Sequence, residues 1–261
     1  MIDGRGARSL TRSGTAEAAG VMDDDWWQSI AASKARAERR ARRGRSVPIQ
    51  AFILDLDGVL TDTAEYHFRA WKRLADEEGI PFGREENEQL RGVSRRRSLE
   101  LLLGHRVADY GEEQMEEMMS RKNQLYQRFL QSISQDDLLP GARDLIDALK
   151  RRGLRVAVGS ASKNTRIVLG KLGISGAFDG IADGHSVTRA KPAPDVFIHA
   201  AGQLGVPAAA CAVVEDAASG VEAALTAGML AVGIGPEERV GKAHFRYNST
   251  ADVDLNEILG C

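Results

Sequence analysis

The chain has 261 residues, a hydrophobic fraction of 43% and a formal net charge of −2. This length can supply one sizeable domain and a smaller one, and the balanced charge gives no sign of a nucleic-acid-binding surface. Two cysteines, Cys211 and Cys261, are too few for a disulfide framework. No apolar run reaches the roughly 20 residues that a membrane helix needs. We therefore expect a cytoplasmic, monomeric protein with free thiols and with neither a nucleic-acid nor a membrane partner.

Residues 1–47 differ in composition from the rest of the chain. An acidic-aromatic patch, Asp23–Trp27, precedes a basic run from Lys34 to Arg45 that holds seven lysines or arginines and one glutamate. Because this composition buries little apolar surface, we expect a disordered or partly helical basic arm. The arm is either a solvated tail or a docking segment for an anionic partner.

The ordered part is expected to start near Pro48. The apolar run 49–54 predicts a buried strand that ends at Asp55. Asp62 is a candidate N-cap for the next helix, and Glu65 is placed for a capping box. From there to about residue 135 the chain is rich in Glu, Arg, Leu and Met and shows no strand pattern. This stretch therefore predicts one helical unit.

From residue 139 onward, predicted strands and helices alternate. Strands are expected at 154–158, 210–214 and 229–234, and helices at about 141–152, 164–172, 195–204 and 217–227. Such alternation is typical of a parallel sheet with right-handed crossovers. The sequence thus predicts an α/β core at 48–64 and 139–261, with an all-helical cap at 65–138 inserted after the first strand.

Polar residues gather where these predicted strands end. The sets are Asp55 and Asp57, then Ser160 with its neighbours, then Lys191, then Glu215 and Asp216. Taken singly, each is explained as a turn or cap residue. Ligands of an open parallel sheet bind beyond the carboxyl ends of its strands, so the joint placement predicts a site.

These residues suit phosphoryl transfer. One aspartate, Asp55, can attack phosphorus, and a second, Asp57, can exchange a proton with the substrate hydroxyl. A divalent cation with oxygen ligands removes the repulsion between nucleophile and phosphate, and Mg²⁺ suits this chemistry, with Asp55, Glu215 and Asp216 as natural ligands. Lys191 adds positive charge, and Ser160 with nearby backbone N–H groups can hold the remaining oxygens.

The run Asp55-Leu-Asp-Gly-Val, followed by Ser160, Lys191 and Glu215-Asp216, resembles the four-motif signature of the haloacid dehalogenase superfamily. The resemblance covers about residues 50–235. It implies a Rossmann-like core with a helical cap, Asp55 as nucleophile, Asp57 as general acid–base and Mg²⁺ as cofactor. It also implies that the backbone carbonyl of Asp57 is a metal ligand and that Ala161 joins Ser160 and Lys191 at the phosphate.

Four further segments resemble the β-phosphoglucomutases: 61–71, 87–95, 160–164 and 191–195. That resemblance implies interconversion of β-glucose 1-phosphate and glucose 6-phosphate through a β-glucose 1,6-bisphosphate, so the partners expected are small sugar phosphates. The residues implied at the substrate are Thr63, His67, Trp71, Arg91, Gly92, Arg95, Lys122, Ser162, Lys163 and Asn164. One departure is Arg91, where the family has lysine, and it bears on sugar positioning.

Several of these residues also have a structural explanation that needs no contact with the substrate. His67 fits a supporting hydrogen bond better than a proton relay, since Asp57 already supplies the acid–base group. Trp71 fits a core position, and Arg95 lies in a charge run that usually forms a solvated helix face.

Other functions stay open at this stage. A sugar-phosphate phosphatase would use the same catalytic residues, with water in place of a sugar hydroxyl as the attacking group. A dehalogenase leaves Asp57 without a role, and a phosphonatase needs an amine that Lys122 only weakly offers. A binding or scaffold protein that uses the basic arm would have no need of the catalytic set.

Overall fold

The structure is a computed structural model, and it describes residues 47–260. Its centre is a six-stranded sheet in the order β3-β2-β1-β4-β5-β6, in which every pairing is parallel. The strands are β1 (Ala51–Leu54), β2 (Arg155–Gly159), β3 (Gly180–Ala182), β4 (Cys211–Glu215), β5 (Leu230–Ile234) and β6 (Phe245–Tyr247). This arrangement confirms the predicted α/β, Rossmann-like fold class.

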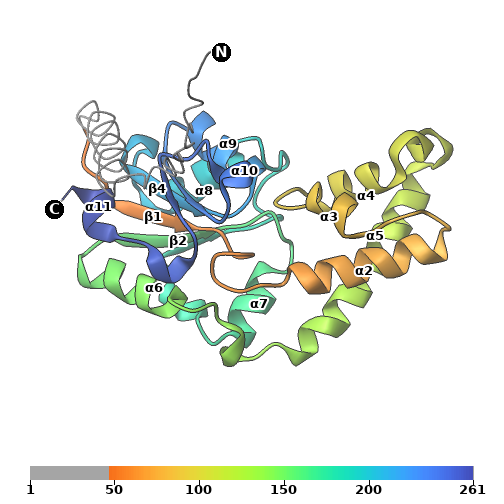
Figure 1. Cartoon of the computed structure of the whole chain (residues 1–261), viewed down its shortest axis with the longest axis horizontal. Coiled ribbons are helices and arrows are strands. Elements are labelled where there is room, and N and C mark those ends of the chain that lie inside the picture. The colour runs from red at the N-terminus through yellow and green to blue at the C-terminus, as the bar shows by residue number, and fades with distance from the viewer. Residues whose placement is uncertain (1–46, 261) are drawn as a thin grey trace, which may run out of the picture. The chain divides into compact units, whose positions relative to one another are not determined.

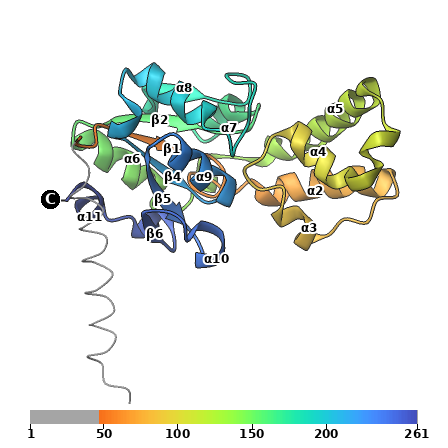
Figure 2. The ribbon, with the colours of Figure 1, turned by 90° about the horizontal axis from the view of Figure 1, so that it is seen from above.

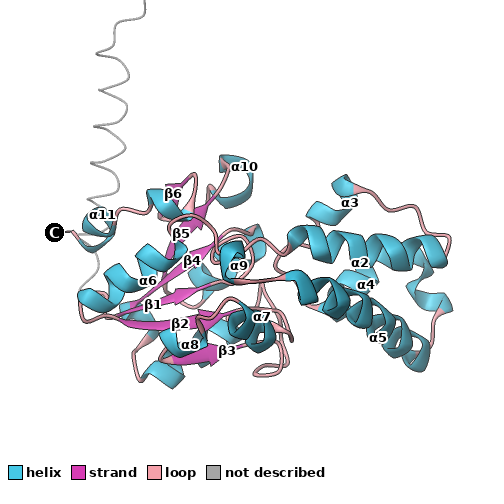
Figure 3. Ribbon diagram, turned by 90° about the horizontal axis from the view of Figure 1, so that it is seen from below, coloured by secondary structure: helices cyan, strands magenta, loops and turns pink. Residues whose placement is uncertain are grey.

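Both faces of the sheet are covered, so its central strands are apolar throughout. In β1, Phe52 and Leu54 face one layer while Ala51 and Ile53 face the other. The first layer contains α6 (Ala142–Arg151), α7 (Thr165–Lys171) and α11 (Leu255–Leu259). The second contains α8 (Asp195–Leu204), α9 (Ala218–Thr226) and α10 (Glu237–Val240). Figures 2 and 3 show the sheet between these helices.

An all-helical segment follows β1. It consists of α2 (Ala64–Glu77), α3 (Arg84–Glu88), α4 (Arg95–Leu103) and α5 (Glu112–Phe129), with short 3₁₀ turns at Gly104–Asp109, Leu130–Ser132 and Gln135–Asp137. Helices α2, α4 and α5 pack around an apolar cluster of their own, which includes Trp71, Leu99 and Met118. Figure 1 shows them beside the carboxyl ends of the strands.

The chain leaves the sheet for these helices and returns at one place. The Thr61 hydroxyl donates to the carbonyl of Asp137 at 2.7 Å, and the Leu139 N–H donates to the carbonyl of Leu60 at 2.9 Å. We call residues 64–138 the insert from here on. That the insert and the sheet fold as separate domains stays a prediction.

Several short elements and one cap differ from the sequence expectations, and among them are helices α10 and α11, which follow the last predicted strand. The three-residue strands β3 and β6 were not predicted, because each is too short to show a hydrophobic period. Helix α2 has Thr63 at its N-cap position. Asp62 accepts from the Ala64 N–H at 3.0 Å, and Glu65 forms an ion pair with Arg84, so the predicted capping box is wrong.

Apart from Val47, the predicted basic arm lies outside the described residues. Between residues 47 and 260, no helix combines the length and apolar character needed to cross a membrane. Cys211 is buried in β4, and burial raises the pKa of its thiol to about 11.

Candidate active site

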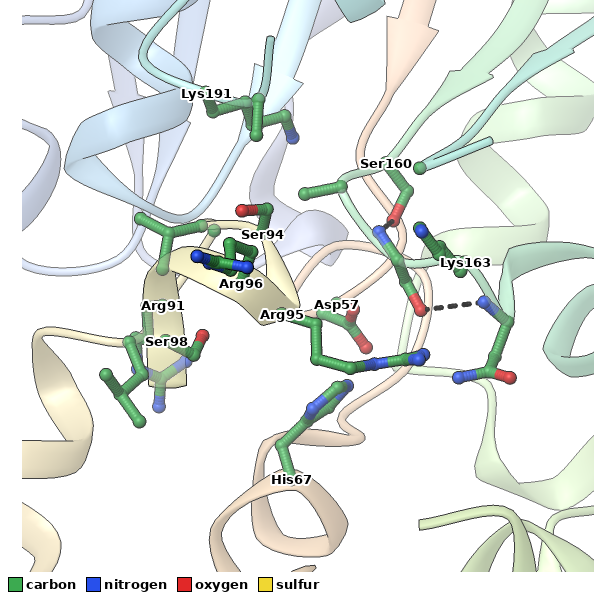
Figure 4. A pocket seen from close by; sticks show the side chains of 18 of the residues that line it. Asp57, His67, Arg91, Ser94, Arg95, Arg96, Ser98, Ser160, Lys163 and Lys191 are labelled. Atoms are coloured by element: carbon green, nitrogen blue, oxygen red, sulfur yellow. Dashed lines mark hydrogen bonds between the residues drawn. The ribbon is translucent and has the colours of Figure 1, made fainter. Parts of the chain in front are cut away.

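A cavity of about 760 Å³ opens beyond the carboxyl ends of β1, β2 and β4, and the insert supplies its other side. The sheet edge contributes residues such as Asp55, Ser160 and Asp216, while the insert contributes Arg91 and Arg95. Figure 4 shows Ser160 from the sheet loop together with Arg91 and Arg95 from the insert. Segments far apart in the sequence therefore meet at a single site.

Three carboxylates lie at the sheet edge. Oxygens of Asp55, Glu215 and Asp216 lie within 4.8 Å of one another, and all three residues are buried. Such a set of hard oxygen donors fits a small divalent cation. Burial and the Asp55 charge raise the pKa of Glu215 to about 8 and that of Asp216 to about 6, so this cluster of negative charge needs a positive partner.

Lys191 supplies part of that charge. Its Nζ donates to Asp55 Oδ1 at 2.6 Å and to Glu215 Oε2 at 2.7 Å. Burial by itself would lower the pKa of Lys191, but the two carboxylates outweigh it and raise the pKa above its usual value. The lysine is therefore a fixed positive charge beside Asp55. The other Glu215 oxygen accepts from the backbone N–H groups of Asp216 and Ala217.

Asp57 lies apart from the three-carboxylate cluster. Its side chain accepts a hydrogen bond from the Thr63 hydroxyl, which in turn accepts from Tyr126 at 3.2 Å. Its backbone N–H donates to Asp55 Oδ2 at 3.1 Å. Burial, followed by the neighbouring Asp55 charge, raises the pKa of Asp57 to about 7. A carboxyl group with this pKa can both give and take a proton near neutral pH.

Lys122, which is buried, and His67, which is partly buried, form a second pair on the insert side. Lys122 Nζ lies 2.8 Å from His67 Nδ1 and 4.8 Å from the ring centroids of Trp71 and Tyr126. Burial, and then the Lys122 and Arg95 charges, hold the pKa of His67 well below its usual value, which favours a neutral imidazole. Burial and the Arg95 charge also hold the pKa of Lys122 well below its usual value. This geometry supports an orienting role for His67. Trp71 is 2% exposed and belongs to the insert's apolar cluster while also lining the cavity.

The loop after β2 is folded by its own hydroxyls. Ser160 Oγ accepts from the Ser162 N–H, and Ser162 Oγ accepts from the Asn164 N–H, both at 3.1 Å. Ser160, Ala161, Ser162, Lys163 and Asn164 all line the cavity. Figure 4 shows Lys163 at this end of it.

The insert reaches the site through the segment before α4. Arg91 donates to Asp216 Oδ2 at 3.1 Å and to Glu88 Oε2 at 3.0 Å. Gly92 has a φ of +68°, and a Cβ there would lie 2.6 Å from Ser219 Oγ, so glycine permits this close approach. Arg91 thus points at the carboxylate cluster.

Arg95 lines the cavity, and its contacts differ from those of its two neighbours in the charge run. Its guanidinium donates to Asn123 Oδ1 at 2.7 Å, and Figure 4 shows the side chain extending toward the loop that follows Ser160. Arg96 and Arg97 pair with Glu100 near the surface. Arg96 also lines the cavity, whereas Arg97 does not, so the charge run is only partly a solvated face.

The structure brings the predicted site residues together. All of them line the cavity except Thr63 and Glu215. Thr63 contacts Asp57, and Glu215 contacts Lys191. Sequence reasoning missed Tyr126 and Asn123. Both sit on α5 at positions that look like ordinary helix residues, and no spacing rule distinguishes them.

Comparisons with known proteins agree with this geometry. The family model of the haloacid dehalogenase-like hydrolases matches residues 49–228. The chain belongs to the haloacid dehalogenase-like hydrolases. Within this family it is 42% identical to a β-phosphoglucomutase of Bacillus subtilis over 81% of this chain and 94% of that protein.

A solved structure and a second relative extend the comparison. A β-phosphoglucomutase structure from Clostridium difficile superposes with a TM-score of 0.78 at 40% identity, over 80% of this chain and 95% of that one. A phosphorylated carbohydrates phosphatase of Thermotoga maritima is 28% identical over 81% of this chain and 97% of that protein. The haloacid dehalogenase-like family thus includes both mutases and phosphatases among the relatives of this chain.

Proposed function

We propose that this protein is a β-phosphoglucomutase, which interconverts β-D-glucose 1-phosphate and glucose 6-phosphate. The observation that carries the proposal is one cavity lined by two aspartates with a lysine and also by a second set of cationic side chains. Asp55, Asp57 and Lys191 form the first set, and Arg95 and Lys163 belong to the second. A substrate that bears phosphate on either side of a sugar ring fits such a cavity. The 42% identity to the Bacillus enzyme supports the same activity.

The reacting end has the groups that an aspartyl-phosphate mechanism needs. In one half of the cycle, a carboxylate oxygen of Asp55 attacks one phosphorus of bound glucose 1,6-bisphosphate, the bond from that phosphorus to the sugar oxygen breaks, and Asp57 gives the oxygen a proton, which yields a sugar monophosphate. In the other half, Asp57 takes the proton from the free hydroxyl of a sugar monophosphate, whose oxygen attacks the aspartyl-phosphate; the Asp55–phosphorus bond breaks and the bisphosphate forms. Lys191, held between Asp55 and Glu215, offsets the phosphate charge beside the nucleophile.

The carboxylate cluster is the proposed Mg²⁺ site. Asp55, Glu215 and Asp216 would hold the ion together with the backbone carbonyl of Asp57. When bound, Mg²⁺ supplies positive charge that stabilises the transferring phosphoryl group. Ser160 and Ala161 are the proposed contacts for the reacting phosphate, beside Lys191.

The remaining cavity residues are proposed to hold the sugar and its second phosphate. Arg95, Ser162, Lys163 and Asn164 would grip the non-reacting phosphate. The sugar side would be formed by Trp71, Arg91, Gly92 and Lys122, while Thr63 and His67 orient the acid–base group and its surroundings. We further propose a monomeric, cytoplasmic enzyme of small sugar phosphates, in which the insert acts as a cap domain at 65–138.

A sugar-phosphate phosphatase is the second candidate, and the similarity to the Thermotoga phosphatase favours it. The two activities differ only in whether water or a sugar hydroxyl attacks the aspartyl-phosphate. The proposed cap, by closing over the site and excluding water, and the proposed grip on a second phosphate would both favour the mutase.

A coupled assay tests the proposal. The protein is supplied with Mg²⁺, β-glucose 1-phosphate and a trace of glucose 1,6-bisphosphate, and glucose 6-phosphate and free phosphate are followed together. We expect glucose 6-phosphate with little free phosphate. Stoichiometric release of free phosphate would move the protein to the phosphatases, and no product of either kind would contradict the glucose assignment.

A further inference from the structure

A single side-chain oxygen joins the two sides of the cavity at its second phosphate end. Asn123 Oδ1, on α5, accepts from the Arg95 guanidinium of α4 at 2.7 Å. The same oxygen accepts from the Asn164 side-chain amide of the sheet loop at 3.0 Å. Arg95 and Asn164 are two of the proposed ligands of the non-reacting phosphate. They approach from different parts of the chain, and the carbonyl of Asn123 is what they share.

The Asn164 amide is held from both ends. Gln127 lies one helical turn after Asn123, and its Nε2 donates to Asn164 Oδ1 at 3.2 Å. The backbone N–H of Asn164 donates to Ser162 Oγ. Since Asn164 is only 4% exposed, these contacts determine the direction in which its remaining amide N–H points.

The neutrality of the Asn123 amide matters for Arg95. A guanidinium has five N–H groups, so giving one to Asn123 leaves four available. Within the described part of α4, the ion pairs involve Arg96 and Arg97, whose carboxylate partners cancel their charge. An amide oxygen orients Arg95 without such cancellation, which leaves its charge for an anionic ligand.

We propose that Asn123 is a positioning residue that aligns Arg95 and Asn164 into one phosphate site across the cavity. This inference rests on the proposed function of that site as the grip on the non-reacting phosphate. Because the phosphate must contact residues from the insert and from the sheet loop together, the Asn123 oxygen lowers the ordering cost of binding. The residue acts through Arg95 and Asn164 and needs no contact with the reacting atoms.

Two ligands separate this role from a structural one. Glucose 6-phosphate affinity is measured by calorimetry in the presence of Mg²⁺, and hydrolysis of p-nitrophenyl phosphate is measured on the same full-length samples. Only a phosphate beside Asp55 can be hydrolysed, so the second assay reports on the reacting end alone. Asn123→Ala is compared with Gln124→Ala, an exposed neighbour on the same helix.

We expect Asn123→Ala to weaken glucose 6-phosphate binding about tenfold, as for the loss of a well-placed polar contact, with p-nitrophenyl phosphate hydrolysis unchanged. Gln124→Ala should change neither. Asn123→Asp keeps an acceptor but cancels the Arg95 charge, so it should also weaken glucose 6-phosphate binding while the thermal midpoint is retained.

The opposing results are distinct. An equal loss in both assays would make Asn123 a structural residue, and unchanged glucose 6-phosphate affinity in Asn123→Ala would remove it from the site; either overturns the inference. Failure of the mutase proposal itself would appear differently, as free phosphate in the coupled assay with the wild-type chain. The ratio of glucose 6-phosphate affinities between the wild-type chain and each Asn123 variant does not depend on that outcome.

Discussion

Asp55 and Asp57 are separated by one residue, yet their side chains have different surroundings. Asp55 contacts Lys191 and belongs to the three-carboxylate cluster, whereas Asp57 is held by the Thr63 hydroxyl. Lys191 places a positive charge beside Asp55 that can offset an incoming phosphate, whereas burial raises the pKa of Asp57. The first aspartate is thus suited to attack and the second to proton exchange.

The two aspartates should respond differently to an isosteric change. Asp55→Asn removes the attacking oxygen charge, and we expect glucose 6-phosphate formation to fall at least about 10⁴-fold, since no other group replaces the nucleophile. Asp57→Asn keeps the nucleophile, so slow phosphoryl transfer should remain, with a loss of about 10²–10⁴-fold. Rapid-quench detection of the aspartyl-phosphate distinguishes them. Substantial turnover in Asp55→Asn would contradict the assignment.

The raised pKa of Asp57 predicts a pH effect on stability in EDTA. Between its ordinary pKa of 3.8 and about 7, the folded state retains a proton on Asp57 that the unfolded state has lost. The unfolding free energy therefore decreases as pH rises through this window. In the Asp57→Asn variant, the unfolding free energy should fall by roughly 1–2 kcal/mol less than in the wild-type chain between pH 5 and pH 8. Urea titrations at the two pH values measure both decreases. Parallel profiles for the two proteins would argue against a perturbed Asp57.

At the scale of elements, the strand ends bring the reactive groups to one edge of the sheet, and the turns that follow the strands orient their side chains. Asp57 lies beyond β1, in a turn where its backbone pairs with that of Thr61, so strand alternation does not place it. Glu215 is the last residue of β4, and the first turn of α9 packs directly against its carboxyl group. The junction of strand and helix thus determines where Glu215 points.

Gly220 on α9 makes that junction testable. A Cβ at Gly220 would overlap the Glu215 carboxyl group, whereas Gly202 on α8 has no atom within 4 Å of its Cβ position. Gly220→Ala should therefore destabilise the fold by about 1–3 kcal/mol and weaken Mg²⁺ binding. The control Gly202→Ala should stabilise it by about 0.5–1 kcal/mol, because alanine favours the helix. Chemical denaturation measures both, and a neutral Gly220→Ala would refute the packing argument.

At the scale of the whole described chain, the sheet and the insert each supply part of one cavity. The chain crosses between them only near residues 61–63 and 132–138, where Thr61 bonds the carbonyl of Asp137. Contacts across the cavity are few and polar, such as Arg91 with Asp216 and Asn123 with Asn164. Such contacts exchange readily with ligand contacts, which suits a cap that closes on its substrate.

Mg²⁺ should stabilise the folded protein, because the three carboxylates come together only when it is folded. At a concentration 100 times the dissociation constant, binding contributes about 2.7 kcal/mol, which corresponds to an increase of roughly 5–10 °C in Tm. Asp216→Asn should lose most of this increase. Differential scanning calorimetry with Mg²⁺ and with EDTA measures it, and equal shifts in both proteins would place the ion elsewhere.

Residues 1–46 should be dispensable for the reaction. In the described chain, the cavity-lining residues extend from Asp55 to Asp216. We therefore expect a chain that starts at Val47 to keep the kcat and KM of the full-length protein in the coupled assay. Gel filtration of the two proteins tests whether the basic arm is a docking segment, because an arm that binds a partner would change the elution volume. A loss of activity on truncation would assign the arm a role in catalysis.

The sequence by itself determined the fold class and predicted the catalytic set. Buried parallel strands leave long apolar runs, and the motif residues follow those runs directly, so the sequence predicts Asp55, Ser160 and Glu215 at one edge of the sheet. Local pattern was sufficient here because strand ends of a parallel sheet share an edge whatever the details of packing. It failed for β3 and β6, which are too short to carry a period.

Only the tertiary structure decided which residues meet across the cavity. Arg95 was indistinguishable from Arg96 and Arg97 within its charge run, and the contact with Asn123 singles it out. Asn123 itself has no motif, because its role depends on Asn164, which lies 41 residues further along the chain. Contacts of this kind depend on how helices pack around the site, and a helical sequence pattern specifies the buried face of a helix but not the polar partner that a side chain at its edge will meet.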